Sequence, residues 1–373
     1  MKIGLVCPYN MFQFAGGVQD VVVQLHKGLV ENGHEVKIIT SRPRAYSSDA
    51  PKDYLLLGRS AKFNTLATMV DIGFEAYSDE IDNILSKEKF DVIHFHEPWV
   101  PFVSRQILTR SQAVNVATFH AKSPENFMSK SIIGSAVPYT KSVLSYLHSL
   151  TAVSDAASEY VCSLTDEPIT IVPNGIDLDK FKPAQTKTQP QKTILFLGRL
   201  DKRKGLEYLL DAYDLLRKKH DDVKLVIAGS GVRRKFLEKY VKQYNIPDVE
   251  FLGYIPEEDK VRLMASADVY CSPAPFGESF GIVLLEAMAV NVPVVAGNNS
   301  GYSGVMTETG QLSLVNPRST VDFAQRLDLM LYDEAVRKIW QQWARKNVKK
   351  YESSQITKMY ENVYIEALDK YGR

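Results

Sequence analysis

The chain has 373 residues, of which 45% are hydrophobic and 24% are charged, and its formal net charge at pH 7 is +1. This length exceeds one ordinary core and predicts two domains, and the near-neutral charge gives no argument for nucleic acid as a partner. No apolar run reaches the roughly 20 residues that span a bilayer, which excludes a membrane-spanning protein.

Short β-branched runs alternate with helical patterns through the first part of the chain. Strands are predicted at residues 2–7, 35–40, 91–96, 115–120, 149–154 and 169–174. Between the first two, residues 17–33 have the apolar spacing of one helix face and end at Gly33, which favours a left-handed cap. Such strands, apolar on both faces, predict a parallel sheet covered by helices on both sides.

Residues 173–192 are rich in Pro, Gln, Lys and Thr, and they predict a hinge or linker. A second series of strands is predicted at residues 193–198, 223–229, 249–254, 269–273, 293–297 and 311–315. The predicted domains are residues 1–172, joined by a C-terminal helix of about residues 352–373, and residues 193–351. Ligands of such sheets lie outside the carboxyl ends of strands, so we expect a cleft between the two domains.

Glycines and acidic residues in loops give weaker signals. Gly16 and Gly17 precede a helix and suit close approach of a ligand to backbone N–H groups, although a plain tight turn fits equally well. GSGVRR (229–234) lacks the third glycine of a dinucleotide fingerprint, which argues against nicotinamide binding. Asp177 and Asp179 lie in the predicted linker, and we interpret them as turn and helix-cap residues rather than metal ligands.

Cations gather where the first strand of the second series ends, in FLGRLDKRKG (196–205). A guanidinium at Arg199 and an ammonium at Lys204 suit the binding of a diphosphate. For Lys202 and Arg203 a solvated basic turn is the alternative interpretation.

Histidines end two predicted strands, in HFHEP (94–98) and ATFHAKSP (117–124). His120 is placed at a carboxyl strand end, where a ligand binds, and histidine commonly transfers protons at neutral pH. We expect His94 and His96 to point to opposite faces of their strand, so that one of them is structural. No spacing of His, Asp or Glu matches a metal site.

Two glutamates lie in PFGESFGIVLLEAMA (275–289). Glu278 is in a loop just ahead of a helix, where the N–H groups of the next three residues surround it and its carboxylate can accept sugar hydroxyls. Glu286 follows a little over two helical turns later, among apolar residues. Because an unpaired buried charge is costly, vicinal hydroxyls such as those of a ribose are the expected partners of Glu286, and a glutamate that reaches solvent is the alternative.

These motifs resemble glycosyltransferase family 4, the retaining nucleotide-sugar enzymes with the GT-B fold. The likeness spans nearly the whole chain, through CPYN, GGVQ, HEP, ATFH, AVSD, PNGID, FLGRLDKRKG, ADVYCSP and GESFGIVLLEAMA. Within the family, GGVQ, HEP, ATFH and GESFGIVLLEAMA look most like phosphatidylinositol α-mannosyltransferases. The resemblance implies two doubly wound Rossmann-like domains that face each other across a cleft, with a C-terminal helix that returns to the first domain.

The resemblance also implies a role for each matching position. Donor binding is assigned to Gly16, Gly17, Arg199, Lys204, Glu278, Ser279, Phe280, Gly281, Ile282 and Glu286. Acceptor binding is assigned to Tyr9, Gln19 and His120. Catalysis is assigned to His120, Glu278, Arg199 and Lys204, without a metal and with no cofactor beyond the nucleotide-sugar co-substrate.

We therefore expect retaining transfer of mannose from GDP-mannose to a hydroxyl of a membrane lipid such as phosphatidylinositol. A UDP-sugar donor with another lipid or small-molecule acceptor remains open, because nothing in the sequence separates guanine from uracil. A non-transferring sugar-nucleotide epimerase or binder also remains open. Trp99, after HEP, departs from the polar residue of the inositol-lipid enzymes and leaves the acceptor undecided.

Two segments, residues 99–110 and 127–149, carry apolar, aromatic and basic residues at helical spacing. They predict contact with a membrane surface, and ordinary packing is the alternative. We expect a cytoplasmic protein that touches the inner face of the cell membrane, with Cys7, Cys162 and Cys271 as reduced, buried thiols.

Overall fold

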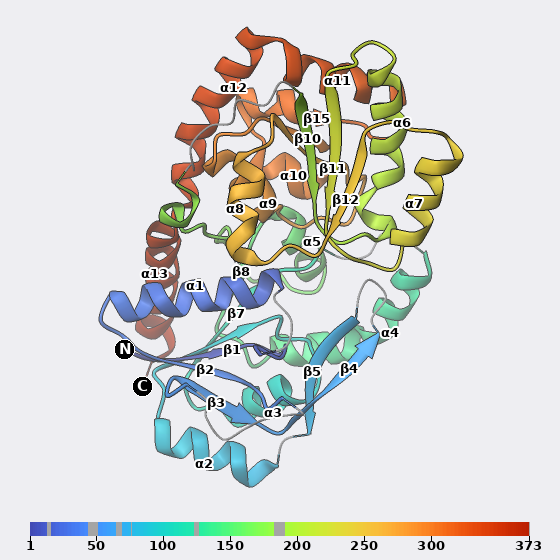
Figure 1. Cartoon of the computed structure of the whole chain (residues 1–373). Coiled ribbons are helices and arrows are strands. Elements are labelled where there is room, and N and C mark those ends of the chain that lie inside the picture. Colours follow the sequence, from blue (N-terminus) through green and yellow to red (C-terminus); the bar gives the residue numbers. More distant parts are fainter. Residues whose placement is uncertain are drawn as a thin grey trace. The chain divides into compact units, whose positions relative to one another are not determined.

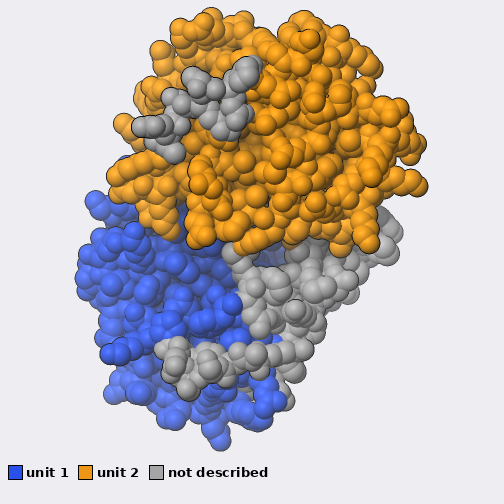
Figure 2. All heavy atoms as spheres, in the orientation of Figure 1, with its two compact units in different colours: residues 1–175, 353–373 blue, residues 176–352 orange. Residues whose placement is uncertain are grey.

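The computed structural model describes residues 1–12, 16–43, 51–64, 69–75, 77–122, 127–182 and 191–372, without the side chains of 61–64, 69–75 and 127–135. The chain forms two compact units (Figures 1 and 2). Unit 1 is Met1–Gly175 with Ser353–Arg373, and unit 2 is Ile176–Glu352. The divisions therefore fall at Gly175 and Glu352, whereas the sequence analysis placed them at residue 172 and about residue 352.

Unit 1 contains a seven-stranded sheet in the order β3-β2-β1-β6-β7-β8-β9, and every pairing in it is parallel. Its strands are β1 (Lys2–Val6), β2 (Glu35–Ser41), β3 (Tyr54–Leu57), β6 (Val92–His96), β7 (Val114–Phe119), β8 (Ser149–Ala152) and β9 (Ile169–Ile171). Sequence periodicity missed only β3 among these, a four-residue edge strand. It also missed the antiparallel pair of β4 (Arg59–Asn64) and β5 (Met69–Glu75).

The helices of unit 1 cover this sheet. They are α1 (Gly17–Glu31), α2 (Ser78–Glu88), α3 (Val103–Leu108), α4 (Phe127–Leu144), α5 (Asp155–Cys162) and α13 (Ser353–Tyr371). The predicted left-handed conformation at the end of α1 is confirmed, because Gly33 has a φ of +86°. The C-terminal helix α13 belongs to unit 1, where Tyr360 and Tyr364 join the same buried cluster as β1 and α1.

Unit 2 contains a six-stranded parallel sheet in the order β12-β11-β10-β13-β14-β15. Its strands are β10 (Lys192–Leu197), β11 (Val223–Ala228), β12 (Val249–Gly253), β13 (Val269–Ser272), β14 (Val294–Gly297) and β15 (Leu314–Val315). Its α-helices are α6 (Leu206–Arg217), α7 (Arg234–Gln243), α8 (Glu257–Ala265), α9 (Ile282–Ala289), α10 (Ser300–Val305), α11 (Thr320–Tyr332) and α12 (Glu334–Asn347). The strand order is that of a Rossmann fold, so the predicted class of two doubly wound α/β domains is confirmed.

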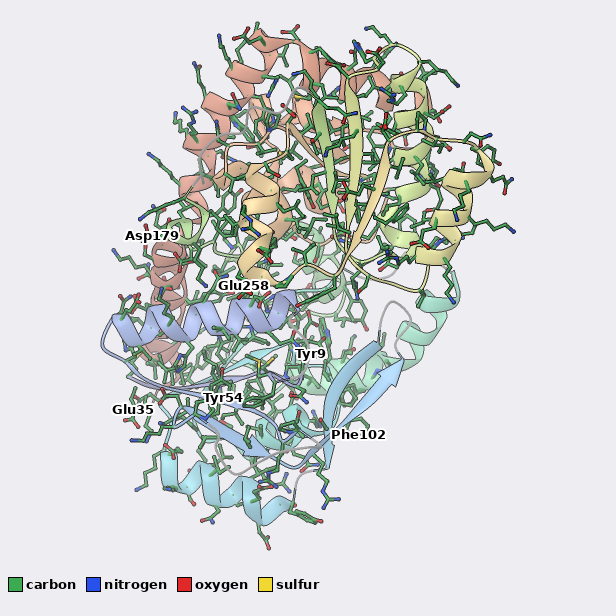
Figure 3. All side chains as sticks on the ribbon, in the orientation of Figure 1. Tyr9, Glu35, Tyr54, Phe102, Asp179 and Glu258 are labelled. Atoms are coloured by element: carbon green, nitrogen blue, oxygen red, sulfur yellow. The ribbon has the colours of Figure 1, made fainter. Side chains whose placement is uncertain are left out.

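Two smaller expectations about the chain need correction. Cys7 and Cys271 are buried free thiols as expected, but Cys162 is exposed. Asp177 stands at the N-cap position of a 3-10 helix, yet its side chain makes no capping hydrogen bond. Asp179, labelled in Figure 3, instead has a carboxylate oxygen 3.0 Å from the ammonium of Lys182. No helix among the described residues is both long and apolar enough to cross a bilayer.

Candidate functional site

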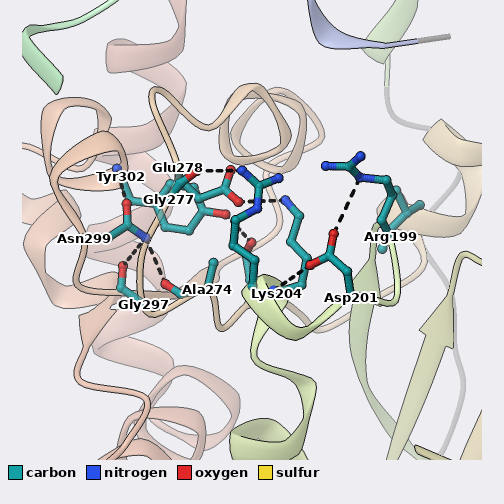
Figure 4. Close-up of polar contacts among 12 residues, drawn as sticks. Arg199, Asp201, Lys204, Ala274, Gly277, Glu278, Gly297, Asn299 and Tyr302 are labelled. Carbon is teal, nitrogen blue, oxygen red and sulfur yellow. Dashed lines mark hydrogen bonds and ion pairs between the residues drawn. The ribbon is translucent and has the colours of Figure 1, made fainter. Parts of the chain in front are cut away.

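In unit 2, the predicted donor residues gather beyond the carboxyl ends of β10 and β13. These two strands are neighbours at the point where the strand order reverses, which is where open α/β sheets bind ligands. The chain leaves β10 into a 3-10 turn, η2 (Lys202–Lys204), and leaves β13 into the loop that precedes α9. Figure 4 shows these two segments side by side.

A lysine–glutamate ion pair joins the two segments. The ammonium of Lys204 lies 2.9 Å from Oε1 of Glu278, and the two side chains are only 14% and 12% exposed. Asp201 caps the turn by accepting a hydrogen bond from the backbone N–H of Lys204 at 3.2 Å. The structure thus brings together the two residues that the sequence assigned to the diphosphate and to the transferred sugar.

Arg203 holds the loop that carries Glu278. Its Nη1 donates to the carbonyl oxygen of Gly277 at 2.7 Å. Gly277 has a φ of +77°, and a Cβ at this position would lie 2.7 Å from Cδ of Arg203, so only glycine fits under the arginine. The interpretation of Arg203 as a solvated basic residue is therefore wrong, whereas Lys202 is exposed, as that interpretation expects.

The loop between β13 and α9 is also held by contacts with Asn299 and Tyr351. Asn299 caps α10 by accepting from the N–H of Tyr302 at 3.0 Å and donates to the carbonyl of Ala274 at 2.9 Å. Phe280 is buried, with its ring edge-on to Tyr351. The carboxylate of Glu278 accepts a hydrogen bond from the ammonium of Lys204 at 2.9 Å, and the expected ring of N–H groups around it stays a prediction.

Arg199 lies two residues after the end of β10, and its side chain is 48% exposed. Its Nε lies 3.8 Å from Oδ2 of Asp201. Gly229 lies behind this segment, and a Cβ on it would come within 1.9 Å of the carbonyl oxygen of Gly198. Close backbone packing therefore accounts for the first glycine of GSGVRR, in agreement with the rejection of a dinucleotide fingerprint.

Glu286 is buried in α9, and its partner is a lysine that the sequence analysis missed. Nζ of Lys260, on α8, lies 2.7 Å from Oε1 of Glu286 and 2.6 Å from Oε1 of Glu257. Burial alone would lower the pKa of Lys260, but the two carboxylates hold it above its usual value. A lysine in an ordinary charged helix pattern gives no sequence signal, so only the packing of α8 on α9 shows this pair. Ile282, also in the predicted donor set, begins α9.

In unit 1, four predicted residues lie at the start of α1 and in the loop after β1. Gly16 is the N-cap of α1, with an ordinary extended φ of −138°, and Gly17 is its first helical residue. A Cβ on Gly16 would lie 2.4 Å from Oε1 of Gln19, so this glycine makes room for that side chain. Gln19 donates a hydrogen bond to the carbonyl oxygen of Asn10 at 3.3 Å. Asn10 follows Tyr9, which is labelled in Figure 3.

His120 follows β7 and is only 7% exposed. Burial lowers its pKa to about 3, so at neutral pH its ring is a neutral hydrogen-bonding group rather than a proton carrier. Its neighbour His96 shares a strand face with His94, and their ring centroids are 4.2 Å apart. The expectation of opposite faces was wrong, because residues two apart in a strand point the same way.

Trp99 and α3 favour ordinary packing over membrane contact for residues 99–110. Trp99 stacks on Phe119 with ring centroids 4.2 Å apart. Four of the six residues of α3 are buried, and Arg105 donates to Ser142 through both Nη atoms. Residues 123–126 and the side chains of 127–135 lie outside the described part, so the second segment stays a prediction.

Solved structures show the class of the fold. The chain superposes on sucrose-phosphate synthase from Thermosynechococcus elongatus with a TM-score of 0.79, 19% identity and 99% coverage of both chains. It superposes on HepE from Anabaena, solved in complex with UDP-glucose, with a TM-score of 0.74, 15% identity and coverage of 98% and 100%. These two likenesses show that the chain has the GT-B fold, with two Rossmann-like domains.

Two family models together match most of the sequence. Residues 177–347 match Glycosyl transferases group 1, and residues 15–180 match Glycosyltransferase Family 4. A phosphatidyl-myo-inositol mannosyltransferase from Mycobacterium leprae is 32% identical over 97% of both chains. The protein of that name from Mycolicibacterium smegmatis is 33% identical over 97% of this chain and 94% of its own. The chain belongs to glycosyltransferase family 4.

Among the described residues, no group of three or more His, Cys, Asp and Glu side chains could hold a metal ion. Metal independence of the reaction stays a prediction.

Proposed function

We propose that this enzyme transfers a mannosyl group from GDP-mannose to a hydroxyl of a phosphatidylinositol lipid. The observation that carries the proposal is similarity along almost the whole chain to proteins named phosphatidyl-myo-inositol mannosyltransferase. The site of unit 2 supports the donor part, because it offers two cations and two carboxylates at the ligand-binding edge of a Rossmann sheet.

In this proposal the donor exchanges partners with the protein. Phosphate oxygens take the place of Glu278 at the ammonium of Lys204, and Arg199 adds a second cation. Glu278 then accepts hydrogen bonds from hydroxyls of the sugar, and Glu286 accepts from the ribose hydroxyls. The diphosphate thus pairs with the cations of the site, and the sugar and ribose hydroxyls donate to its two carboxylates. Without the donor, these charged side chains pair with one another.

Transfer breaks the bond between the anomeric carbon and the diphosphate oxygen, and the electron pair leaves with GDP. The acceptor hydroxyl oxygen forms its new bond on the same face of the sugar, and its proton moves to the leaving phosphate oxygen. Arg199 and Lys204 stabilise the charge that develops on the diphosphate, a role worth roughly 100- to 1,000-fold in rate for one well-placed donor. We propose that these cations act without a metal, so that EDTA leaves the rate unchanged.

Because a phosphatidylinositol acceptor lies in a lipid bilayer, the enzyme must bind the bilayer surface to reach it. We propose peripheral contact with the inner face of the cell membrane. Sedimentation with vesicles that contain or lack phosphatidylinositol tests this contact. Binding only to the phosphatidylinositol vesicles supports it, and absence of binding to both contradicts it.

A ligand panel followed by a transfer assay tests the proposed reaction. A donor at about 100 times its dissociation constant stabilises a protein by roughly 2.7 kcal/mol, so we expect GDP-mannose to raise the melting midpoint above that with UDP-glucose or UDP-N-acetylglucosamine. We then expect an α-mannosyl lipid, identified by the anomeric signal in NMR, from GDP-mannose and phosphatidylinositol vesicles. Stabilisation by a UDP-sugar instead would overturn the donor assignment. Donor consumption without any acceptor would favour an epimerase.

A further inference from the structure

Three buried histidine rings of unit 1 form a connected group, which we call the histidine column: His94, His96 and His120. Nδ1 of His94 lies 2.8 Å from the hydroxyl of Tyr364 on α13, and its Nε2 lies 2.6 Å from Oγ1 of Thr118. The rings of His94 and His96 are in contact, and Nδ1 of His96 lies 2.9 Å from Nε2 of His120. The column therefore connects the C-terminal helix α13 to His120, the residue that follows β7.

A buried carboxylate holds the backbone at the end of the column. Oε1 of Glu97 accepts the N–H groups of His120 at 2.6 Å and of Ala121 at 2.7 Å. Its Oε2 accepts the indole N–H of Trp99 at 3.0 Å. Glu97 is 3% exposed and has a φ of +53°, a left-handed conformation that a non-glycine residue keeps only where its surroundings fix it. Three N–H donors thus hold the carboxylate in place, and it in turn fixes the loop that carries His120.

The protons of the column follow from its burial. Burial lowers the pKa of His94 and of His120 to about 3 and that of His96 well below its usual value, so all three rings are neutral at pH 7. A neutral imidazole has one N–H and one bare nitrogen. The contact between His96 and His120 therefore has one donor and one acceptor.

The environment of His96 decides the direction of that hydrogen bond. Its Nε2 is buried, and no described residue hydrogen-bonds to it. If this nitrogen carried the proton, the ring would hold an unpaired buried N–H, and such groups are rarer than unpaired buried acceptors. With the proton on Nδ1, His96 donates to Nε2 of His120, and His120 must carry its own proton on Nδ1. No described residue accepts from Nδ1 of His120.

We propose that His96 and Glu97 are positioning residues for His120. His96 donates from Nδ1 to Nε2 of His120 and fixes the proton of that ring on Nδ1, while Glu97 fixes the backbone beneath it. His120 then presents Nδ1–H as a hydrogen-bond donor to an oxygen atom of the sugar substrate. The ligand in this last statement rests on the proposed function, whereas the position of the proton does not.

Nitrogen NMR of the full chain labelled with ¹⁵N-histidine tests the proton directly. The signals of His120 are assigned by their loss in His120→Gln. We expect the wild-type ring to carry its proton on Nδ1, and His96→Leu to move it at least partly to Nε2. His96→Asn keeps an amide N–H near the place of Nδ1, so we expect it to preserve the wild-type state. A wild-type proton on Nε2, or no change in His96→Leu, would overturn the proposal.

Kinetics then separate positioning from general stability. We expect His96→Leu and Glu97→Gln to lower kcat by roughly 10- to 100-fold, because misplacement of about 1 Å costs that much, with donor KM unchanged. Trp99→Phe is the graded comparison. It keeps the stacking on Phe119 and removes one of the three N–H donors to Glu97, so we expect a smaller loss of kcat than in Glu97→Gln. A normal kcat in Glu97→Gln would contradict the role of Glu97. If the wild-type protein transfers no sugar, the proposed function fails, and the NMR result still decides the proton.

Discussion

The two units of this enzyme place polar side chains at the same edge of similar parallel sheets, but they use opposite chemistry. Unit 2 gathers full charges, in the pairs Lys204–Glu278 and Lys260–Glu286, whose side chains are between 9% and 15% exposed. Unit 1 gathers neutral rings in the histidine column, which is buried to 7% exposure or less. The site of unit 2 is therefore held by ion pairs that lie at a partly exposed edge of its sheet. The histidine column of unit 1 is held by buried packing.

This difference indicates which region can change partners. A charged group at a partly exposed edge can exchange an internal carboxylate for a ligand phosphate, because both satisfy the same charge. A buried neutral ring cannot exchange its partners without exposing polar atoms, so it can only present a fixed group. We therefore propose that the charges of unit 2 bind the donor and that the rings of unit 1 hold His120 in a fixed position.

The largest expected effect comes from breaking the first ion pair. Lys204→Ala should lower transfer by roughly 100- to 1,000-fold, since the developing charge on the diphosphate loses one of its two cations. Initial rates with GDP-mannose and phosphatidylinositol vesicles measure this loss. Circular dichroism should show an intact fold, because the pair lies at an edge of the sheet rather than in the core.

Lys202→Ala is the matched control for this change. Lys202 has the same side chain in the same 3-10 turn, but it is exposed. Its removal should leave the rate within about twofold, as surface substitutions usually do. An equal loss in both variants would show that general basic charge, rather than the Lys204 ammonium, carries the effect.

A smaller effect is expected from Arg203, which supports Glu278 without belonging to either pair. Arg203→Lys keeps the charge but loses the rigid fork that reaches the carbonyl of Gly277. We expect kcat to fall roughly 10-fold with little change in GDP affinity, because the loop moves while the phosphate cations stay. Parallel loss of kcat and of GDP affinity would mean that Arg203 binds the phosphate directly.

The second ion pair, Lys260–Glu286, should affect only the binding of the donor and not the rate of transfer. Lys260→Met removes the cation that offsets the buried charge of Glu286, so the nucleoside end of the site is disturbed. We expect the donor KM to rise about threefold to tenfold with kcat nearly unchanged, the pattern of lost uniform binding. Lys260→Arg, which keeps the charge, is the control. A loss confined to kcat would place this pair at the reacting centre instead.

A separate effect concerns the stability of unit 1 in acid rather than the rate of transfer. The folded pKa values of His94 and His120 are about 3, below the usual value near 6.5, so the unfolded chain binds more protons between these limits. The free energy of unfolding should therefore fall as the pH falls from about 6.5, by at most about 1.4 kcal/mol per pH unit for each histidine. Burial raises the pKa of Glu97, which offsets part of this loss.

Urea midpoints between pH 7 and pH 5 measure this slope. The wild-type midpoint should fall more steeply than that of His94→Phe, which has one titrating ring fewer. Equal slopes in the two proteins would show that the column does not control acid stability.

Much of the fold could be predicted because strands and helices repeat along the chain. Six strands in each unit follow from apolar runs bounded by glycine and proline, and α1 follows from its apolar face and Gly33. Strand β3 was missed because a four-residue edge strand carries little periodic signal, and the β4–β5 pair was missed as well.

Site residues could be predicted only where a charged residue occupies an unusual place in the sequence pattern. Arg199, Lys204, Glu278 and Glu286 stand out because charges follow strands or interrupt apolar helices. Lys260 could not be predicted, because its partner lies on another helix. Arg203 looked like part of a solvated turn, and its contact with Gly277 depends on a loop that only the fold brings near.

Calorimetric titration of GDP into the wild-type protein, Lys204→Ala and Glu278→Gln tests the central claim most directly. If the pair exchanges its carboxylate for phosphate, Lys204→Ala should weaken GDP binding at least about tenfold, which corresponds to about 1.4 kcal/mol. Glu278→Gln should bind GDP as tightly as the wild type or more tightly, because Lys204 no longer competes with an internal carboxylate. Equal weakening in both variants would contradict the account, since it would make the pair a structural contact rather than a donor site.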